Sequence, residues 1–438
     1  MLKTIPYPSK EAEAKLALIA ARKTGADPAI EKRVLDIIEA VKRDGDDALI
    51  RYTRQFDAPG LTADRLTVGE EEIEAAFREI APDFLRILRT AARNIEEFHR
   101  GQLRPSSFTA KPDGTFLGQI IRPVDAAGLY IPGGKGGETP LISSVLMNAI
   151  PARLAGVRDI ALVTPPRRDG SINPYLLSAA REAGVTRIHR AGSAWAIAAL
   201  AFGTASIARV DVIVGPGNIY VALAKKIVAG EVGIDLLAGP SEILIIGDDT
   251  ADPECVAADL LSQAEHDPMA SAVLITMEES LADRAAASIE RQIALLPRRQ
   301  IAAEALNRYG AIFQVGCAED AANLANAMAP EHLELQVADP WSWVGRIRHA
   351  GAIFLGGSTP EAVGDYFAGP NHVLPTAGTA RFASALGVEN FLKKTSVISY
   401  SKEALERDAS SIIRLAELEG LEAHAASVRV RVKVTGNG

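Results

Sequence analysis

Apolar residues recur with helical spacing in the N-terminal part of the chain. Four of them stand at the i, i+3 and i+4 intervals that place side chains on one face of a helix: Val34, Leu35, Ile38 and Val41. Pro28 precedes them and suits a first helical turn. Gly45 and the pair of aspartates after it interrupt the spacing. The pattern predicts a helical N-terminal region with a break at Gly45.

From Ala126 onward, short apolar runs alternate with helical stretches. Six runs are rich in β-branched residues and are flanked by Gly or Pro: 128–131, 160–163, 210–214, 243–246, 272–275 and 352–355. Such runs are typical of buried parallel strands connected by helical crossovers. The pattern therefore predicts an α/β fold. Segments rich in Gly and Pro at 131–137 and 237–241 bracket a block of typical domain size, and each is predicted to cross between domains.

The last part of the chain begins with a predicted helix over 401–419. Ser401 is its expected N-cap, and Glu403 lies in the first turn, where a carboxylate is favourable. Gly420 breaks the helical pattern. Beyond it, 423–427 has a helical pattern but 428–434 alternates with the period of a strand, so the local signal leaves helix and strand open.

Composition indicates a globular protein. The 438 residues, of which 48% are hydrophobic and 23% charged, can bury extensive cores. A net charge of -8 and scattered basic residues argue against nucleic acid or an anionic membrane as partner. The N-terminus lacks the apolar stretch of a signal peptide and no apolar run is long enough to span a bilayer, so we expect a cytoplasmic protein. Cys255 and Cys317 have no paired spacing, which argues against a disulfide framework or a thiolate zinc site.

Three short polar segments interrupt the apolar sequence: 262–266, 330–332 and 364–372. They concentrate Gln, Glu, Asp and His, the side chains that coordinate divalent metals or transfer protons near neutral pH. Three of the seven histidines lie there, and His424 lies near the C-terminus. A site that gathers all four must be closed by the fold or by a second subunit.

The first and third segments supply candidate metal ligands. Residues 252–266 are predicted to form one helix, on which Gln263 and His266 stand three apart and can hold one metal ion. A Gln oxygen is a weak ligand, so a polar helix end remains an alternative. Asp365 adds an anionic oxygen in a segment whose glycines predict a tight turn, although an Asp there also stabilises such a turn.

The second segment supplies candidate acid–base groups. Glu331 and His332 are adjacent, and neighbouring side chains diverge in any regular element. His332 can accept a proton from an alcohol while Glu331 deprotonates water; a surface Glu–His pair is the alternative. His372 shares the third segment with Asp365 and is expected beside the site. We expect no catalytic role for the three histidines that neighbour an Arg: His99, His189 and His349.

The residues alone do not predict a dinucleotide. No Gly-x-Gly-x-x-Gly follows a predicted strand and opens a helix: segment 134–139 ends in Thr139, and 215–218 also fails.

Taken together, the motifs resemble those of the histidinol dehydrogenase family over nearly the whole chain. The segments that carry the resemblance are 128–134, 198–204, 215–218, 238–242, 263–266, 330–333 and 364–375. Several long motifs in this order are highly specific. The resemblance implies an α/β fold with two incomplete Rossmann-like domains and small helical N- and C-terminal extensions, in a domain-exchanged homodimer. It also implies that the tail around His424 is helical.

The resemblance divides the chain into four parts. An N-terminal helical extension covers 1–24. A first Rossmann-like domain, 25–127 plus 240–380, carries the metal and catalytic residues. A second, on the cofactor side, covers 128–239, and a C-terminal segment, 381–438, crosses to the partner subunit.

The function implied by the resemblance is zinc-dependent, NAD-linked oxidation of L-histidinol to L-histidine through L-histidinal, by two hydride transfers at the end of histidine biosynthesis. The positions that match the zinc ligands, one zinc ion per site, are Gln263, His266, Asp365 and His424. Glu331 and His332 match the catalytic pair. Contacts with the small-molecule substrate map to Ser241, Gln263, His266, His332, Asp365, Glu419 and His424. NAD contacts map to Tyr130 and Asn218, and both active sites of the homodimer are composite.

Two departures from the family lie on the cofactor side. Trp195 occupies a place where the family often has a Gln that contacts NAD; an indole can stack on the cofactor but offers only one donor. The loop 135–141 is longer than the common form. Three alternatives stay open: a paralogue with the same zinc and NAD machinery that oxidises another small polyol or a sulfonated diol, a zinc hydrolase with Glu331 as base, and a non-catalytic metal-stabilised binding protein.

Overall fold

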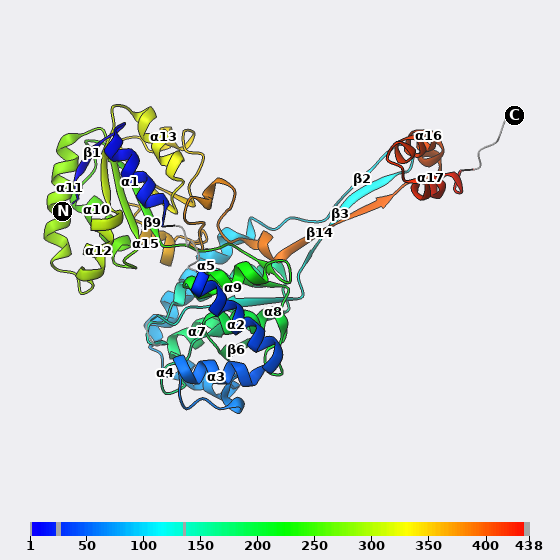
Figure 1. The fold of residues 1–438 in the computed structure, drawn as a ribbon, viewed down its shortest axis with the longest axis horizontal. Coiled ribbons are helices and arrows are strands. Elements are labelled where there is room, and N and C mark those ends of the chain that lie inside the picture. Colours follow the sequence, from blue (N-terminus) through cyan, green and yellow to red (C-terminus); the bar gives the residue numbers. More distant parts are fainter. Residues whose placement is uncertain (1, 23–27, 135–136, 433–438) are drawn as a thin grey trace. The chain divides into compact units, whose positions relative to one another are not determined.

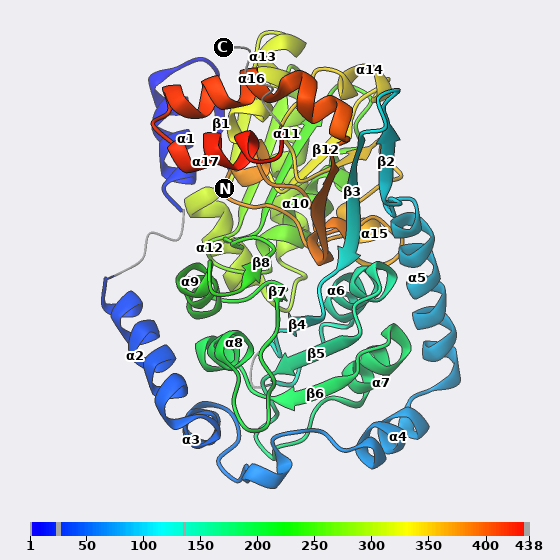
Figure 2. The ribbon, with the colours of Figure 1, turned by 90° about the vertical axis from the view of Figure 1, so that its right-hand side faces the viewer.

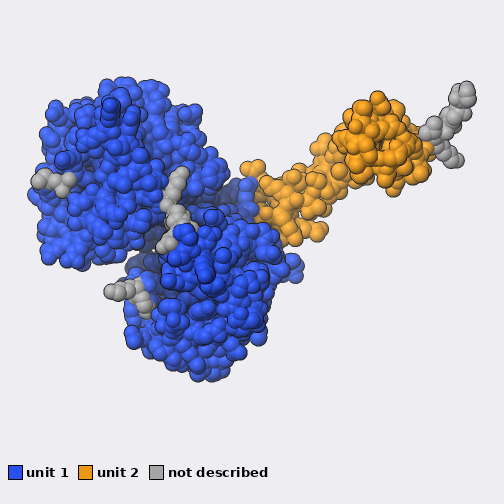
Figure 3. Space-filling view, in the orientation of Figure 1, with its two compact units in different colours: residues 1–102, 124–391 blue, residues 103–123, 392–438 orange. Residues whose placement is uncertain are grey.

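The computed structural model describes residues 2–22, 28–134 and 137–432. Residues 135–136 of the longer loop therefore lie outside the described part. The chain forms two compact units, which Figure 3 colours separately. Unit 1 comprises residues 1–102 and 124–391, and unit 2 comprises residues 103–123 and 392–438.

The first sheet of unit 1 has six parallel strands in the order β1-β11-β10-β9-β12-β13. Their bounds are β1 Thr4–Pro6, β9 Glu242–Gly247, β10 Ser271–Thr276, β11 Ala311–Gln314, β12 His332–Gln336 and β13 Ala352–Leu355. Helices cover both faces (Figure 1). They are α1 Lys10–Ala20 and α13 Ala318–Met328 on one face, and α10 Pro253–Ala264, α11 Glu279–Ile293 and α12 Arg299–Tyr309 on the other.

Strand β9 shows why this sheet needs two helical layers. Its side chains alternate between the two faces because a strand has a period of two residues. Leu244 and Ile246 pack in the core with α1 and α13. Ile243 and Ile245 pack in the core with α10, α11 and α12. Both sets are fully or almost fully buried, as expected for a central parallel strand.

The second sheet of unit 1 has five parallel strands in the order β6-β5-β4-β7-β8. Their bounds are β4 Ala126–Tyr130, β5 Asp159–Thr164, β6 Arg187–Arg190, β7 Val212–Val214 and β8 Gly233–Ile234. The chain runs from β4 through β5 to β6 in one direction, then returns to β7 and β8 on the other side of β4. The strand order therefore reverses between β4 and β7, which is the place where open α/β sheets bind ligands beyond the carboxyl ends of their strands.

Helices also flank the second sheet. In Figure 2, α6 Ile142–Ala155 and α7 Pro174–Ala183 lie on one side and α8 Ser193–Phe202 and α9 Ile219–Val228 on the other. Further helices surround these: α2 Pro28–Asp44 and α3 Asp46–Phe56 share a core with α8 and α9, and α4 Glu70–Glu79 and α5 Pro82–Arg100 pack on α7 and α6. Two short helices belong to the six-stranded sheet: α14 Trp341–Val344 lies between β12 and β13 in the chain, and α15 Glu361–Tyr366 follows β13.

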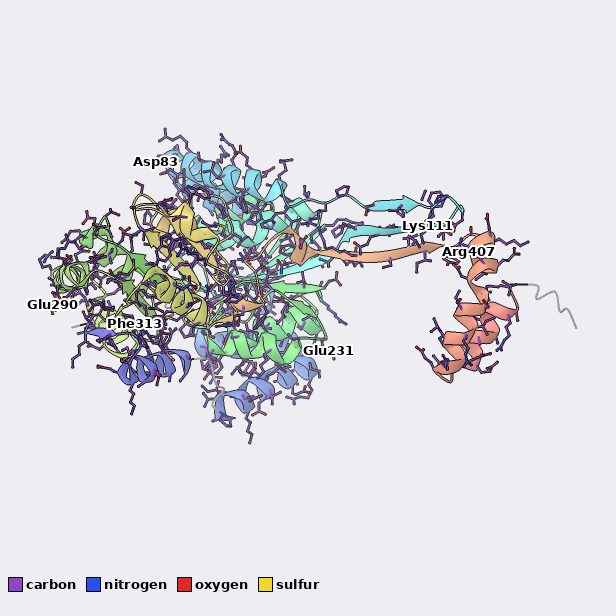
Figure 4. The ribbon with its side chains drawn as sticks, turned by 90° about the horizontal axis from the view of Figure 1, so that it is seen from above. Asp83, Lys111, Glu231, Glu290, Phe313 and Arg407 are labelled. Atoms are coloured by element: carbon purple, nitrogen blue, oxygen red, sulfur yellow. The ribbon has the colours of Figure 1, made fainter. Side chains whose placement is uncertain are left out.

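Unit 2 contains an antiparallel sheet in the order β14-β3-β2, followed by two helices. Its elements are β2 Ser107–Ala110, β3 Phe116–Pro123, β14 Leu392–Ser399, α16 Lys402–Leu418 and α17 Glu422–Arg429. Arg407 of α16 forms an ion pair with Asp113, in the turn between β2 and β3, at 2.8 Å. Figure 4 labels Arg407 and Lys111, which lie at the same end of this unit. The ion pair connects α16 to the turn between β2 and β3.

The coarse fold predicted from the sequence is confirmed. The six predicted strands correspond to β4, β5, β7, β9, β10 and β13, and the predicted break at Gly45 separates α2 from α3. Ser401 caps α16 by accepting a hydrogen bond from the Ala404 N–H at 3.0 Å. The alternating-strand interpretation of the tail is wrong up to Arg429, because α17 is helical to that residue, as the family resemblance implied. Residues 433–434 of that pattern lie outside the described residues.

No helix in the described residues is both long and apolar enough to cross a membrane. The four-part domain division stays a prediction. In the structure, α2 and α3 pack with the helices of the five-stranded sheet, and residues 107–110 and 116–123 pair in unit 2.

Candidate active site

The candidate site lies at the amino ends of two neighbouring central strands. His332 is the first residue of β12 and Glu331 precedes it, while Glu242 is the first residue of β9. The register pairs His332 with Ile243, so Glu242 lies beside both candidate acid–base residues. Glu331 and His332 are buried, with 9% and 2% of their surface exposed. The alternative of a surface Glu–His pair is therefore excluded.

The peptide groups of Glu242 orient both candidate catalytic side chains. Its backbone N–H donates to Glu331 Oε2 at 3.0 Å. Its carbonyl oxygen accepts from His332 Nδ1 at 2.7 Å. Because a carbonyl can only accept, Nδ1 carries the hydrogen and the neutral imidazole keeps a lone pair on Nε2. His332 is thus held in the tautomer that can accept a proton at Nε2.

Burial shifts the pKa values of these two groups in opposite directions, and both shifts favour the uncharged form. Burial, and then the neighbouring charge of His372, lower the pKa of His332 to about 3, so its imidazole is neutral near pH 7. Burial raises the pKa of Glu331 well above its ordinary value. The nearby guanidinium of Arg22, which pairs with Glu242 at 2.5 Å, opposes that rise.

His372 and Glu361 complete a buried cluster with His332. The Nε2 atoms of His332 and His372 lie 3.0 Å apart, and the two rings stack with centroids at 4.8 Å. His372 Nε2 lies 2.8 Å from Glu361 Oε1, so a hydrogen on this nitrogen can serve either neighbour. Burial acts to raise the pKa of Glu361, but the hydrogen bond with His372 and the charges of nearby imidazoles outweigh it and the pKa is lowered. Glu361 is therefore an ionised carboxylate.

Gly364 allows this cluster to form. A Cβ at this position would lie 2.7 Å from the Phe354 ring and 3.2 Å from His372 Nδ1. The predicted tight turn around Asp365 is wrong, because Gly364 and Asp365 belong to helix α15. The space left by this glycine is filled by Phe354 and His372.

The predicted metal ligands come from three helices and from the turn that follows α10. Gln263 lies in the last turn of α10, and its Oε1 is buried without a hydrogen-bond partner among the described residues. The predicted helix 252–266 ends earlier, at Ala264, so His266 lies just beyond it and is exposed. Asp365 is half-buried in α15. His424 lies in α17 of unit 2 and is exposed.

Other atoms in the described residues also have the spacing of a metal site. Ligand atoms of His332, Glu361 and His372 all lie within 4.8 Å of one another. His266 contributes to the electrostatic surroundings of both His332 and Glu361. The structure thus brings His266, from the first polar segment, near His332 of the second segment and near Glu361, which lies just before the third.

A buried polar cluster joins the elements that carry these residues. Gln336 Nε2 donates to Asp259 of α10 and to Glu334 of β12, both at 2.8 Å. Glu334 Oε1 in turn accepts from the backbone N–H of Glu361, at 3.0 Å, at the start of α15. Burial, and then the charge of Asp259, raise the pKa of Glu334 to about 9. The cluster fixes α10 and α15 relative to β12.

The two predicted cofactor residues lie at the carboxyl ends of β4 and β7, where the strand order reverses. Tyr130 ends β4, and its buried hydroxyl accepts a hydrogen bond from the Ser193 N–H at 3.1 Å. Asn218 follows β7 and caps α9 with its side-chain oxygen, which accepts from two backbone N–H groups at 3.1 and 3.2 Å.

Trp195 lies in the core between α8 and α3. Its indole N–H donates to Thr53 Oγ1 at 3.1 Å, and its ring stacks on Tyr52 and Phe56. Only 4% of its surface is exposed. The indole therefore contacts residues of α3 in this structure, and its single donor is used there.

Of the predicted substrate contacts outside the metal set, Ser241 is half-buried immediately before β9, and Glu419 is exposed at the C-terminal end of α16. Sequence reasoning missed Glu361 and Glu242. Glu361 stands four residues before Asp365, which was a usable signal for one helical face. Nothing in the sequence signals the role of Glu242, because its peptide groups rather than its side chain hold Glu331 and His332.

Curated relatives resemble the chain over almost its full length. A histidinol dehydrogenase from Desulfotalea psychrophila is 56% identical over 425 residues, which cover 97% of this chain and 98% of the relative. One from Nitratidesulfovibrio vulgaris is 55% identical and covers 92% of this chain and 93% of its own length. The crystal structure of histidinol dehydrogenase from Elizabethkingia anophelis superimposes with a TM-score of 0.91 at 38% identity, and covers 99% of this chain and 98% of that one.

Parallel α/β sheets with a buried group of imidazoles and carboxylates define the chain as an α/β enzyme that has the means for proton transfer or metal binding. The family model for histidinol dehydrogenase matches residues 20–432. The chain therefore belongs to the histidinol dehydrogenase family and is an oxidoreductase of histidine biosynthesis. The family uses NAD and zinc.

Proposed function

We propose that the chain oxidises L-histidinol to L-histidine through L-histidinal, with His332 and Glu331 as its acid–base residues. The observation that carries this proposal is the pair of hydrogen bonds from the peptide groups of Glu242. They leave His332 Nε2 with a lone pair and orient the carboxylate of Glu331 from an adjacent position. Two differently oriented bases suit a sequence that needs proton removal from an alcohol and then from water.

His332 would accept the hydroxyl proton of histidinol. The imidazole is neutral near pH 7, and the bond from Nδ1 to the Glu242 carbonyl leaves the accepting lone pair on Nε2. His372 Nε2 contacts both His332 Nε2 and the carboxylate of Glu361. His372 can therefore hold the His332 ring in position or pass the proton from His332 to Glu361. Glu331 would take a proton from the water that hydrates the aldehyde, and His332 would act again in the second oxidation.

A zinc ion would be held by Gln263, His266, Asp365 and His424, one ion per site. Gln263 supports this assignment because its buried Oε1 has no partner among the described residues, and a buried oxygen without a partner costs free energy. The donor set is nitrogen and oxygen, which zinc accepts. Bound zinc supplies a Lewis acid that positions and polarises an amino alcohol. The cluster of His332, Glu361 and His372 is the second candidate for holding a metal, because its ligand atoms are close enough.

NAD, the hydride acceptor, would bind at Tyr130 and Asn218. Support comes from their place at the carboxyl ends of β4 and β7, where the strand order reverses. The two parallel sheets would then be incomplete Rossmann-like domains without the glycine fingerprint, with NAD on the side of residues 128–239.

The protein would act as a cytoplasmic homodimer in which the C-terminal segment, 381–438, supplies Glu419 and His424 to the partner's site. Exposed apolar side chains in unit 2 support this proposal: Leu415 (64%), Leu418 (66%) and Val430 (79%). Large apolar side chains this exposed, on α16 and at the end of α17, are typical of a surface that another chain covers. The expected substrate contact of Ser241 belongs to the same composite site.

The decisive experiment counts NADH formed per histidinol consumed, by absorbance of the reduced nicotinamide. Two NADH per histidinol support the proposal. No NADH would favour a hydrolase or a binding protein, and faster turnover of small polyols or sulfonated diols would favour a paralogue. Zinc content distinguishes the two metal sets: Gln263→Leu should lose zinc and His372→Asn should retain it, whereas the opposite result would place the metal in the His332 cluster.

A further inference from the structure

Lys225 and Asp235 form an ion pair in the interior of unit 1. Their side chains are only 2% and 1% exposed. Removing two charges from water is expensive, and replacing such a pair by apolar residues is often neutral or stabilising. Stability alone therefore does not account for this pair, and its contacts indicate another use.

The ion pair holds both backbone groups of one glycine. Asp235 Oδ2 accepts a hydrogen bond from the Gly215 N–H at 2.7 Å. Lys225 Nζ donates to the Gly215 carbonyl at 3.0 Å and also contacts Asp235 Oδ1. Asp235 follows β8 and Lys225 lies in α9, so the pair connects two elements to the residue that directly follows β7.

No residue with a side chain could replace Gly215 in this position. Its φ of +110° lies in the region that favours glycine. A Cβ at this position would lie 2.2 Å from the carbonyl oxygen of Tyr130, at the end of β4. The glycine therefore packs directly against the neighbouring strand at the point where the strand order reverses.

The next residues along the chain form the start of α9. Asn218, three residues after Gly215, caps the helix and is exposed. The cap and the N-terminus of α9 can take up their positions only if the turn 215–218 keeps its conformation. Because Lys225 and Asp235 bind the backbone of Gly215, the first residue of this turn is fixed relative to β4 and β7.

We propose that Lys225 and Asp235 are positioning residues for NAD: they hold the turn 215–218 in the conformation that presents Asn218 and the N-terminus of α9 to the cofactor. This inference rests on the proposed function, in which NAD binds beyond β4 and β7. Neither residue touches the cofactor. The pair should therefore affect NAD affinity and leave the affinity for histidinol and the chemical step almost unchanged.

The test measures NADH binding directly, by its fluorescence, with histidinol absent. The main variant is the double substitution Lys225→Met with Asp235→Leu, which leaves no unpaired buried charge. Asp235→Asn is the conservative variant, since an amide oxygen can still accept from the Gly215 N–H. Asp211→Asn is the matched control: Asp211 Oδ2 accepts from the N–H groups of Asp125 and Ala126 at the amino ends of the same strands.

The double variant should weaken NADH binding about 10-fold or more, because small displacements of a positioning element cost one to two orders of magnitude. Asp235→Asn should weaken it less, and Asp211→Asn should leave it within about 2-fold of wild type even where thermal stability falls. In steady state, KM for NAD should rise while KM for histidinol and kcat at saturating NAD stay within about 3-fold.

Unchanged NADH affinity in a folded double variant would overturn the inference, as would an equal loss in Asp211→Asn. If the double variant does not fold, Asp235→Asn decides alone: a selective rise of the NADH dissociation constant supports the inference, and no rise overturns it. A wild-type protein that binds no NADH would instead refute the proposed function, so the two failures are distinguishable.

Discussion

Glu331→Gln separates the two half-reactions most sharply. Glutamine has the size of glutamate and keeps an oxygen that can accept the hydrogen bond from the Glu242 N–H, now 3.0 Å from Glu331 Oε2. The strand register and the position of His332 should therefore persist. What the substitution removes is the basicity of a buried carboxylate.

The expected loss follows from that chemistry. General-base catalysis contributes roughly 10²–10⁴ in rate, or about 3–5 kcal/mol of barrier. Only the aldehyde step needs a hydrated substrate, so oxidation of histidinal should fall by this factor while oxidation of histidinol falls by less than about 10-fold. Burial raises the pKa of Glu331, so more of its base form is present as pH rises. Wild-type aldehyde oxidation should rise with pH, and the variant should lose this rise.

The assay supplies histidinol or histidinal separately and follows NADH absorbance in single turnovers. His332→Asn is the comparison, because it removes the lone pair that both oxidations use and should slow both. Equal losses in the two steps for Glu331→Gln would contradict the division of labour. A pH dependence that survives the substitution would assign it to another group.

Three further predictions address the metal, the dimer and the fold. Chelation should abolish activity, and manganese or cobalt should restore it because the proposed ligands are nitrogen and oxygen; full activity in metal-free protein would exclude a catalytic metal. Refolding His332→Asn together with His424→Asn, each inactive alone, should return roughly one quarter of wild-type activity, since about half the dimers are mixed and each mixed dimer has one intact site; mixed dimers without recovery would place His424 in its own chain's site. Burial, and then the charge of Arg187, lower the pKa of His189 from 6.5 to about 4. As pH falls, the imidazole of His189 is therefore protonated in the unfolded chain before it is protonated in the folded protein, and stability falls between pH 6.5 and about 4. The loss is about 3 kcal/mol, and urea titrations at several pH values should show His189→Leu to be less acid-sensitive than wild type, which an unchanged pH slope would contradict.

Six of the parallel strands, β4, β5, β7, β9, β10 and β13, were predictable because burial on both faces leaves continuous apolar runs, as in 243–246. The antiparallel sheet of unit 2 was not. The strand over 392–399 is exposed or half-exposed throughout, so no alternation of buried and exposed side chains marks it. This segment forms a strand because it pairs with 116–123, which is distant in sequence. Non-local pairing of this kind leaves little local signal.

The site was predictable to the extent that its chemistry lies in side chains. The spacing of Gln263 and His266 and the adjacent Glu331 and His332 are visible in the sequence. The tautomer of His332 is not visible in the sequence, because it depends on a backbone carbonyl of another strand. The end of helix α10 before His266 also escaped prediction, since helix boundaries depend on capping and tertiary contacts.

The contacts of Glu242 have a consequence for how this site tolerates mutation. Since the bonds to Glu331 and His332 come from the main chain, most replacements at position 242 keep both, and only proline deletes the donor to Glu331. Mutational scanning of position 242 would thus report on the partnership of its side chain with Arg22, and would understate how much catalysis depends on this residue. The orientation of the two bases depends on the register between β9 and β12. A shift of one residue in this register would remove the hydrogen bonds that orient both bases, although neither base would itself be changed.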